Sequence, residues 1–208
     1  MDNFYALFEK EEKLCPTYLE GILHTEFFEK EPFEAKETDF YLGPEGYNKE
    51  TNLPNEFWFV TKDKKYDFDL RYDAGNCYVS SEFLSLLQKF NTIDFQHQNL
   101  HMVNKKKKTI SPKNYHFLHF FNRLEDVVDI EKSNIELYRS CDAKGRIKKI
   151  WDLQLKETVD FPDVFLIKES KISDRLFCSE RFKQAIEQLQ MKGILFVPAN
   201  LADVHKEW

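Results

Sequence analysis

Glycine is scarce in this sequence, and short catalytic motifs are absent. Only 6 of the 208 residues are glycine, and the one closely spaced pair is Gly43 and Gly46, which excludes a glycine-rich loop that cradles phosphate groups. Neither GxSxG, HExxH nor a paired-carboxylate motif occurs. We therefore expect no cofactor, no metal and no enzyme, although an enzyme whose residues converge only in space stays an open alternative.

Long apolar runs, a basic excess and paired cysteines are also missing. No run reaches the length of a membrane span, and the opening Met-Asp-Asn-Phe lacks the basic start of a secretory signal, so we expect a cytoplasmic protein. The 36 acidic and 30 basic residues give a formal charge of −6, which argues against a general nucleic-acid binder and is compatible with a basic partner. The four cysteines form no CxxC pair and are expected to be reduced thiols: Cys15, Cys77, Cys141 and Cys178.

Hydrophobic residues, by contrast, are plentiful. They make up 42% of the chain, and aromatic residues alone make up 15%, which is enough for a substantial core. The clearest local pattern lies between Leu176 and Pro198, where Ser179 is a typical helix N-cap. An apolar face follows it at helical spacing, formed by Phe182, Ala185, Ile186 and Leu189. The pattern predicts a strand, a capped helix closed by Lys192 and Gly193, and a second strand that stops at Pro198.

The same pattern occurs 99 residues earlier in the chain. The aligned residues are Val79, Ser80, Phe83, Leu86, Leu87 and Phe90 with Cys178, Ser179, Phe182, Ala185, Ile186 and Leu189. An internal duplication of a strand-helix-strand unit would explain the match, but any short amphipathic helix behind a serine would give part of it. Both explanations stay open, and both predict two such helices.

Residues 1–55 differ from the rest of the chain. They hold four of the seven prolines and three of the six glycines, and we predict a mostly irregular segment there, followed by an α+β domain over residues 56–208. Within residues 26–39, six carboxylates and two lysines alternate with three phenylalanines. Aromatic anchors in an acidic field could bind a basic protein, or the rings could simply dock a solvated segment on the core. The candidate partner-binding residues are Phe27, Phe28, Glu29, Glu31, Phe33, Glu34, Glu37 and Asp39.

Most other regular segments have patterns that predict strands. Phe57–Thr61 and Tyr66–Tyr72 fit a hairpin, and Tyr115–Phe121 is apolar on both sides, as in a central strand. A second hairpin begins at Ile135, and its returning strand is expected to place on one face Ile147, Trp151, Leu153 and Leu155. The predicted class is α+β, with a largely antiparallel sheet and at least two packed amphipathic helices.

Few residues are candidates for metal binding or catalysis. His97 and His101 are four apart, but their segment is expected to be extended and lacks a third metal ligand. His116 and His119 would point to opposite faces of a strand. Cys178 lies at a helix N-terminus, where a thiol pKa can be lowered, yet no base is evident. The runner-up function is therefore a hydrolase-like enzyme using His97, His101 or Cys178.

A third candidate function is suggested by four consecutive lysines. A nucleic-acid-associated regulator would use Lys105–Lys108 to bind DNA or RNA. Such a run is usually a solvated turn, however, and the chain has no wider basic stripe.

The chain from about residue 77 to residue 201 resembles a family of bacterial polymorphic-toxin immunity proteins, immunity protein family eleven. The resemblance rests on Val79–Ser81, Tyr115, Val127–Ser133, Ile147–Ile150, Phe177–Phe182 and Gly193–Pro198. It implies a non-catalytic protein that binds and neutralises a cognate secreted toxin encoded nearby, with no partner among nucleic acids or membranes. It supplies no catalytic residues, and it places toxin specificity partly in the variable N-terminal segment.

Overall fold

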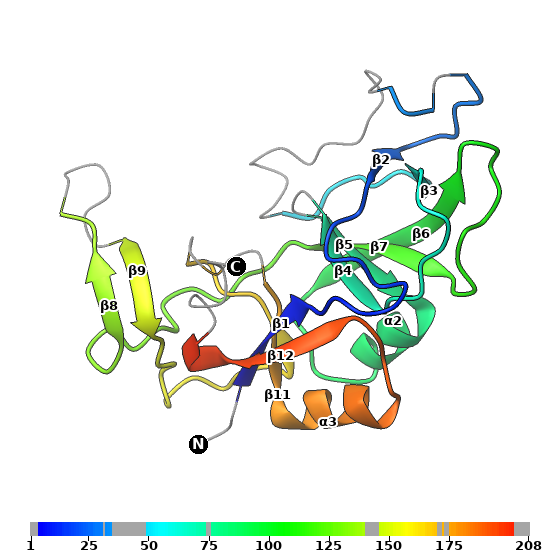
Figure 1. Ribbon diagram of the computed structural model, residues 1–208. Helices are drawn as coiled ribbons and strands as arrows, with labels where there is room; N and C mark the ends of the chain where they lie inside the picture. The colour runs from blue at the N-terminus through cyan, green and yellow to red at the C-terminus, as the bar shows by residue number, and fades with distance from the viewer. Residues whose placement is uncertain are drawn as a thin grey trace.

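The computed structural model describes residues 4–30, 32–34, 49–73, 76–139, 146–169, 172 and 175–201, which form two larger sheets, a separate hairpin and two α-helices (Figure 1). The four-stranded sheet has the order β10-β11-β1-β12, from Val164–Phe165, Phe177–Ser179, Phe4–Glu9 and Ile194–Pro198. The six-stranded sheet has the order β2-β3-β6-β7-β5-β4, from Gly21–His24, Glu56–Thr61, Phe95–Asn104, Tyr115–Phe120, Asn76–Ser80 and Leu70–Asp73. The hairpin joins β8 (Asn134–Leu137) to β9 (Ile147–Asp152).

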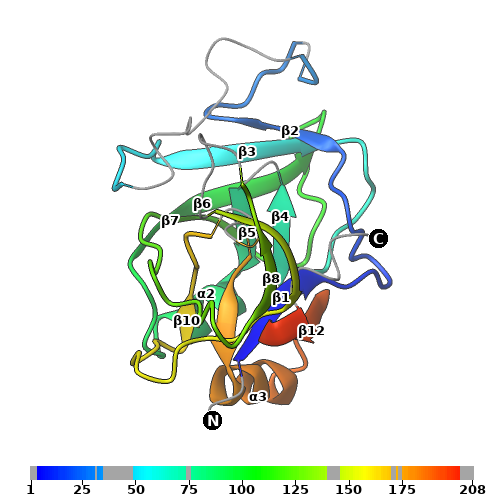
Figure 2. The ribbon, with the colours of Figure 1, turned by 90° about the vertical axis from the view of Figure 1, so that its left-hand side faces the viewer.

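The pairing confirms the predicted α+β class. Within the described part of the chain, every strand pair is antiparallel except β3 with β6, which is parallel. The helices are α2 (Ser81–Leu87) and α3 (Glu180–Gln188), and a short 3-10 helix, η2 (Ala199–Leu201), follows β12. Figure 2 shows α3 at one end of the molecule, beside the four-stranded sheet, and β2 with β3 at the other end.

Two apolar clusters lie on the two faces of the six-stranded sheet. One joins this sheet to the four-stranded sheet and both helices, and includes Val79, Leu118, Phe165, Phe177 and Phe182. The other covers the opposite face and includes Phe57, Phe59, Tyr78, Met102 and Phe117. Strand β7 alternates between the two clusters, so its two apolar faces are both buried, as predicted for a central strand.

Both helices begin at the predicted serine caps. The hydroxyl of Ser80 accepts a hydrogen bond from the N–H of Phe83, and that of Ser179 accepts one from the N–H of Phe182. The two helices meet where the rings of Phe83 and Phe182 pack edge to face, with their centroids 5.9 Å apart.

The end of α3 differs from the prediction. The helix ends at Gln188, and the left-handed residue that closes it is Gln190, with φ of 53°. Gly193 also has a positive φ, of 77°, but it lies three residues further along and does not close the helix. The N–H of Gln190 bonds to Glu187 and the N–H of Met191 bonds to Ile186, which is a Schellman motif. Leu189 is therefore the C-cap, and its side chain is 55% exposed rather than buried.

Two segments also differ from the prediction, one in its strand pairing and the other in which side chains face the core. Residues Tyr66–Tyr72 do not pair with β3, because Tyr66 and Phe68 are fully buried in the cluster on the sheet face and the chain crosses over to form β4 at the far edge. In β9, Trp151 is an extra residue between the partners of Asn134 and Ile135. Because this bulge changes the alternation, Ile150 is buried and Trp151 is exposed.

The first 55 residues contribute two strands that the prediction of a mostly irregular segment omitted. Strand β1 lies inside the four-stranded sheet, between β11 and β12, and β2 forms an edge of the six-stranded sheet beside β3. The signal for β1 is its buried apolar triplet, but its partners lie more than 160 residues away in the sequence. The domain boundary at residue 55 stays a prediction.

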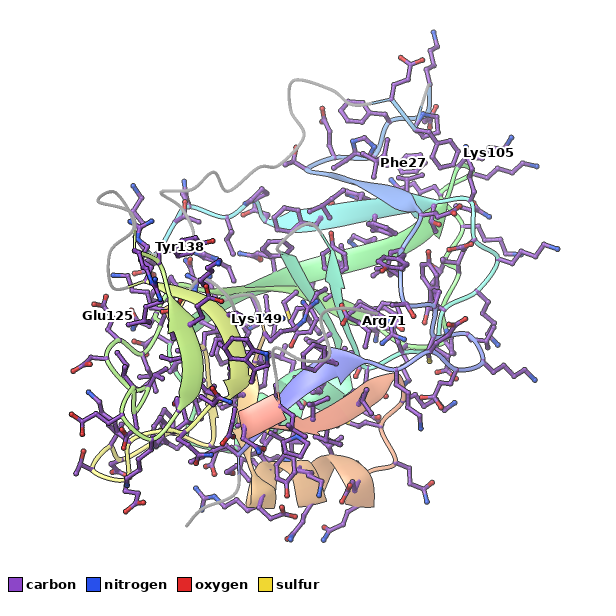
Figure 3. The ribbon with its side chains drawn as sticks, turned by 60° about the vertical axis from the view of Figure 1, so that its left-hand side comes forward. Phe27, Arg71, Lys105, Glu125, Tyr138 and Lys149 are labelled. Carbon is purple, nitrogen blue, oxygen red and sulfur yellow. The ribbon has the colours of Figure 1, made fainter. Side chains whose placement is uncertain are left out.

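Arg71 ties the chain between β1 and β2 to the core. Its side chain is fully buried, and the guanidinium donates hydrogen bonds of 2.5 to 3.0 Å to the carbonyl oxygens of Lys10, Cys15, Pro16, Leu70 and Gly193 (labelled Arg71 in Figure 3). Gly193 must be glycine, because its φ is +77° and a Cβ there would lie 2.6 Å from the Arg71 Nη1.

Candidate functional site

The acidic and aromatic segment predicted as a partner-binding site follows β2 directly. Its described residues lie beside the edge formed by β2 and β3, where Trp58 of β3 stacks on His101 of β6 with ring centroids 4.2 Å apart. Phe27 packs against the same Trp58 at 5.6 Å. The half-buried ring of Phe27 therefore holds the start of the segment on the sheet.

The other two phenylalanines are also docked. Phe28 packs edge to face on His24, which is fully buried and hydrogen-bonded through Nε2 to the carbonyl of Pro32 at 3.0 Å. Phe33 lies under the ammonium group of Lys62, 5.2 Å from the ring centroid. The rings thus anchor the segment to its own chain, as the docking alternative describes.

The carboxylates of this segment point outward. Glu26, Glu29 and Glu34 are exposed, whereas Glu31, Glu37 and Asp39 lie outside the described residues. The structure therefore places five of the eight predicted residues on one surface: Phe27, Phe28, Glu29, Phe33 and Glu34.

The lysine run adjoins this surface. Asn104 shapes the turn by accepting hydrogen bonds from the N–H groups of Lys106 and Lys108, and all four lysines are exposed, as predicted. Lys107 lies over both aromatic rings, 4.4 Å from Trp58 and 5.3 Å from Phe27. Figure 3 shows Phe27 and Lys105 close together at this end of the molecule, which the sequence alone did not indicate.

A hydrogen-bonded pair, His101 and Glu56, also borders this surface. His101 Nε2 lies 2.9 Å from Glu56 Oε2, and this hydrogen bond lowers the pKa of the Glu56 carboxyl. His101 is therefore paired with a carboxylate and stacked on Trp58 rather than placed beside His97 for metal binding. Among the described residues, no group of three or more His, Cys, Asp and Glu side chains is placed to hold a metal ion.

His116 forms a contact that sequence reasoning missed. Its Nε2 lies 2.9 Å from the hydroxyl of Ser81, and its ring meets that of His97 with centroids 5.8 Å apart. Burial, together with His97, lowers the pKa of His116. Three separate elements bring these side chains together, so no local motif could reveal them. His119 faces the other side of β7 and bonds to the carbonyl of Lys49, as the predicted strand requires.

The three cysteines that the structure describes are buried thiols. Cys15, Cys77 and Cys178 are free and buried, and Cys141 lies outside the described residues. Cys178 belongs to β11 rather than to the helix terminus, and burial raises its thiol pKa well above the ordinary value. A protonated, buried thiol is a poor nucleophile, so the geometry gives no support to the enzyme that would use Cys178.

Comparison with known proteins gives a family. The family model described as Immunity protein 43 matches residues 8–208, and no curated protein matches the chain. The match supports an immunity protein, but of family 43 and not of family eleven. Such a family points to a non-enzyme and, in general, to a toxin partner. Within the described residues, no helix has the length and apolar character needed to cross a membrane. The chain belongs to the Immunity protein 43 family.

Proposed function

We propose that this protein binds the toxin domain of a cognate secreted bacterial protein in the bacterial cytoplasm and neutralises it. The observation that carries the proposal is the family match, which spans residues 8–208 and therefore almost the whole chain rather than one motif. The buried free thiols suit a reducing compartment such as the cytoplasm.

The segment after β2 is a proposed contact surface. Docked rings of Phe27, Phe28 and Phe33 hold its backbone, and exposed carboxylates such as Glu29 and Glu34 face the solvent. Charges placed in this way steer a basic partner toward the surface and speed its association. Glu31, Glu37 and Asp39 belong to the same proposal through their sequence alone.

We also infer that the scaffold contains a duplicated unit. In the first unit, the consecutive elements are β4, β5, α2 and β6, and the sheet order β4-β5-β7-β6 places β7 between β5 and β6. In the second unit, the consecutive elements are β10, β11, α3 and β12, and the sheet order β10-β11-β1-β12 places β1 between β11 and β12. Every pair within these two sets is antiparallel. The strand inserted into each unit has a different place in the chain, because β7 follows its unit whereas β1 precedes its own. The inference of a duplication therefore depends on the consecutive elements and not on the inserted strand.

The capping residues support this inference. In each unit the cap serine donates its hydroxyl hydrogen to a buried aspartate that precedes the unit's first strand: Ser80 to Asp69 at 2.5 Å and Ser179 to Asp163 at 2.7 Å. Each cap N–H also bonds to the carbonyl of the same aspartate. Two units with the same four-atom arrangement are what a duplication predicts.

Rescue of growth tests the proposed function. Cells that express the C-terminal domain encoded by the adjacent toxin gene should grow only when they also express this chain. The destabilised variant Phe182→Asp, which buries a charge, should not rescue them. Failure of the folded wild-type chain to restore growth would refute the proposal for that toxin.

Charge reversal tests the proposed surface. Changing Glu29, Glu31, Glu34 and Glu37 to Lys should weaken toxin binding, because the steering field changes sign. A control that reverses four carboxylates on other surfaces, at Glu11, Glu82, Asp160 and Glu187, makes the same change in net charge. Equal affinity of the two variants would show that the segment is not a contact surface.

A further inference from the structure

The β8-β9 hairpin is set apart from the two larger sheets. Its strands pair with each other, and Figure 1 shows the hairpin at the opposite side of the molecule from β2. Buried Ile147 and Ile150 fix its inner face to the core cluster shared by the two sheets. The inner face of the hairpin is therefore anchored to the core, and its other face lies at the surface.

Exposed aromatic rings mark the hairpin. Among the described residues, the exposed aromatic side chains are Tyr18, Tyr138 and Trp151. Two of these three belong to the hairpin: Trp151 lies in β9, and Tyr138 directly follows β8. Trp151 is 43% exposed because the β9 bulge turns it away from the core. Tryptophan and tyrosine are the residues that most often contribute large binding energies at protein interfaces.

The charge of the hairpin is opposite to that of the whole chain. Its described residues, 134–139 and 146–152, carry four basic and two acidic side chains, a net charge of +2, whereas the whole chain carries −6. Lys149 places its ammonium group 5.3 Å from the ring centroid of Trp151, and Lys148 pairs with Glu136 at 2.6 Å. Arg139 and Arg146 are exposed at the end of the ribbon.

We propose that this outer face docks an acidic surface of the toxin domain, with Trp151 as the anchor, Lys149 as the charge beside it and Arg146 as a further charge at the end of the ribbon. The inference rests on the proposed function and names a second surface for it, separate from the acidic segment after β2 and facing a different region of the toxin domain. An exposed tryptophan with a lysine beside it, on a ribbon of net positive charge, favours an acidic face with an apolar pocket. A nucleic acid is the less favoured occupant, because the described part of the hairpin interleaves Glu136 and Asp152 with its basic side chains and offers a polyphosphate a net charge of only +2.

Variants of the hairpin test the inference on the full chain. Calorimetry with the toxin domain encoded by the adjacent gene should show Trp151→Ala weakening binding at least tenfold, as expected for a buried interface anchor. Arg146→Glu should slow association several-fold at low salt, with a smaller effect at high salt. The matched controls are Tyr18→Ala, which removes an exposed ring elsewhere, and Lys89→Glu, which reverses an exposed charge at the end of α2.

The outcomes separate the hairpin from the function. Because the altered side chains are exposed, all variants should keep the wild-type melting temperature. If the wild-type chain binds the toxin domain and the hairpin variants bind equally well, the hairpin inference is wrong and the proposed function stands. If the wild-type chain does not bind, both fail. Salt-sensitive binding of a fluorescent oligothymidine that Trp151→Ala abolishes would assign the surface to nucleic acid and overturn the inference.

Discussion

At the scale of single residues, Arg71 shows how a charged side chain can organise a core. The guanidinium has five N–H donors in a planar fork, and the structure places carbonyl oxygens from four separate parts of the chain around it. Burial lowers the pKa of Arg71, but its ordinary value is so high that the side chain stays charged at neutral pH. Without it, each of those carbonyl groups would lose a hydrogen bond from a charged donor.

We expect Arg71→Met to lower the free energy of unfolding by more than about 3 kcal/mol, because several hydrogen bonds to a charged donor are lost together. Arg71→Lys should recover only part of this loss, since an ammonium group has three donors and no fork. Urea unfolding at neutral pH measures both. The exposed control Arg139→Met should change stability by less than about 0.5 kcal/mol. A wild-type unfolding midpoint for Arg71→Met would contradict this account.

At the scale of elements, local signals and long-range pairing differ in how far a sequence reveals them. The serine caps and the starts of α2 and α3 were predicted, because a cap acts on N–H groups only two or three residues away. The hairpin over 135–152 was also predicted, because it is local, but its bulges changed which side chains face the core. The parallel pairing of β3 with β6 joins Glu56 to Asn99, and nothing in either segment specifies the other.

The candidate site follows the same rule. Its phenylalanines and carboxylates are visible in the sequence, because they form one contiguous segment. The contact of Phe27 with Trp58 and Lys107 was not predictable, since it depends on how β2, β3 and β6 line up. The hydrogen bond of His116 to Ser81 depends in the same way on the pairing of β5 with β7.

The exposed C-cap of α3 provides a test at this scale. Ile186 is 1% exposed and Leu189 is 55% exposed, although both belong to the same predicted apolar face. We expect Ile186→Ala to cost about 2 to 5 kcal/mol of stability, because it leaves a cavity in the core. Leu189→Ala should cost less than about 0.5 kcal/mol. Thermal unfolding of the two variants measures the difference, and equal losses would show that the helix extends beyond Gln188.

At the scale of the whole molecule, the two strand-helix-strand units are joined by reciprocal contacts. Asp69 of the first unit accepts a hydrogen bond from the N–H of Lys192, which follows α3, and Asp163 of the second accepts one from the N–H of Asn91, which follows α2. The N–H groups of both aspartates bond back to the carbonyls of Lys192 and Asn91. Each unit therefore completes the buried aspartate of the other, and the two should unfold together.

The buried carboxylate of Asp163 makes stability depend on pH. Burial acts to raise the pKa of Asp163, but hydrogen bonds from Arg181, Ser179 and the Asn91 N–H outweigh it and hold the pKa below its usual value. Because the folded-state pKa is lower than the unfolded one, this group stabilises the fold above the unfolded pKa of about 4, and the contribution is lost as the pH falls through the folded value.

We therefore expect the free energy of unfolding to decrease as the pH falls below about 4. Asp163→Asn should be less stable than the wild type at pH 7, and its stability should fall less steeply between pH 5 and pH 2. Urea unfolding across this range provides the comparison. Parallel curves for the two proteins would show that Asp163 does not carry the acid sensitivity.

Calorimetric titration of this protein with the purified C-terminal domain encoded by the neighbouring toxin gene tests the central claim most directly. We expect a saturable one-to-one complex with a dissociation constant below about 1 μM, as for an inhibitor that must outcompete the toxin's target. We also expect the complex to lack toxic activity. Absence of binding, with both proteins shown to be folded, would contradict the claim that this chain is the immunity protein for that toxin.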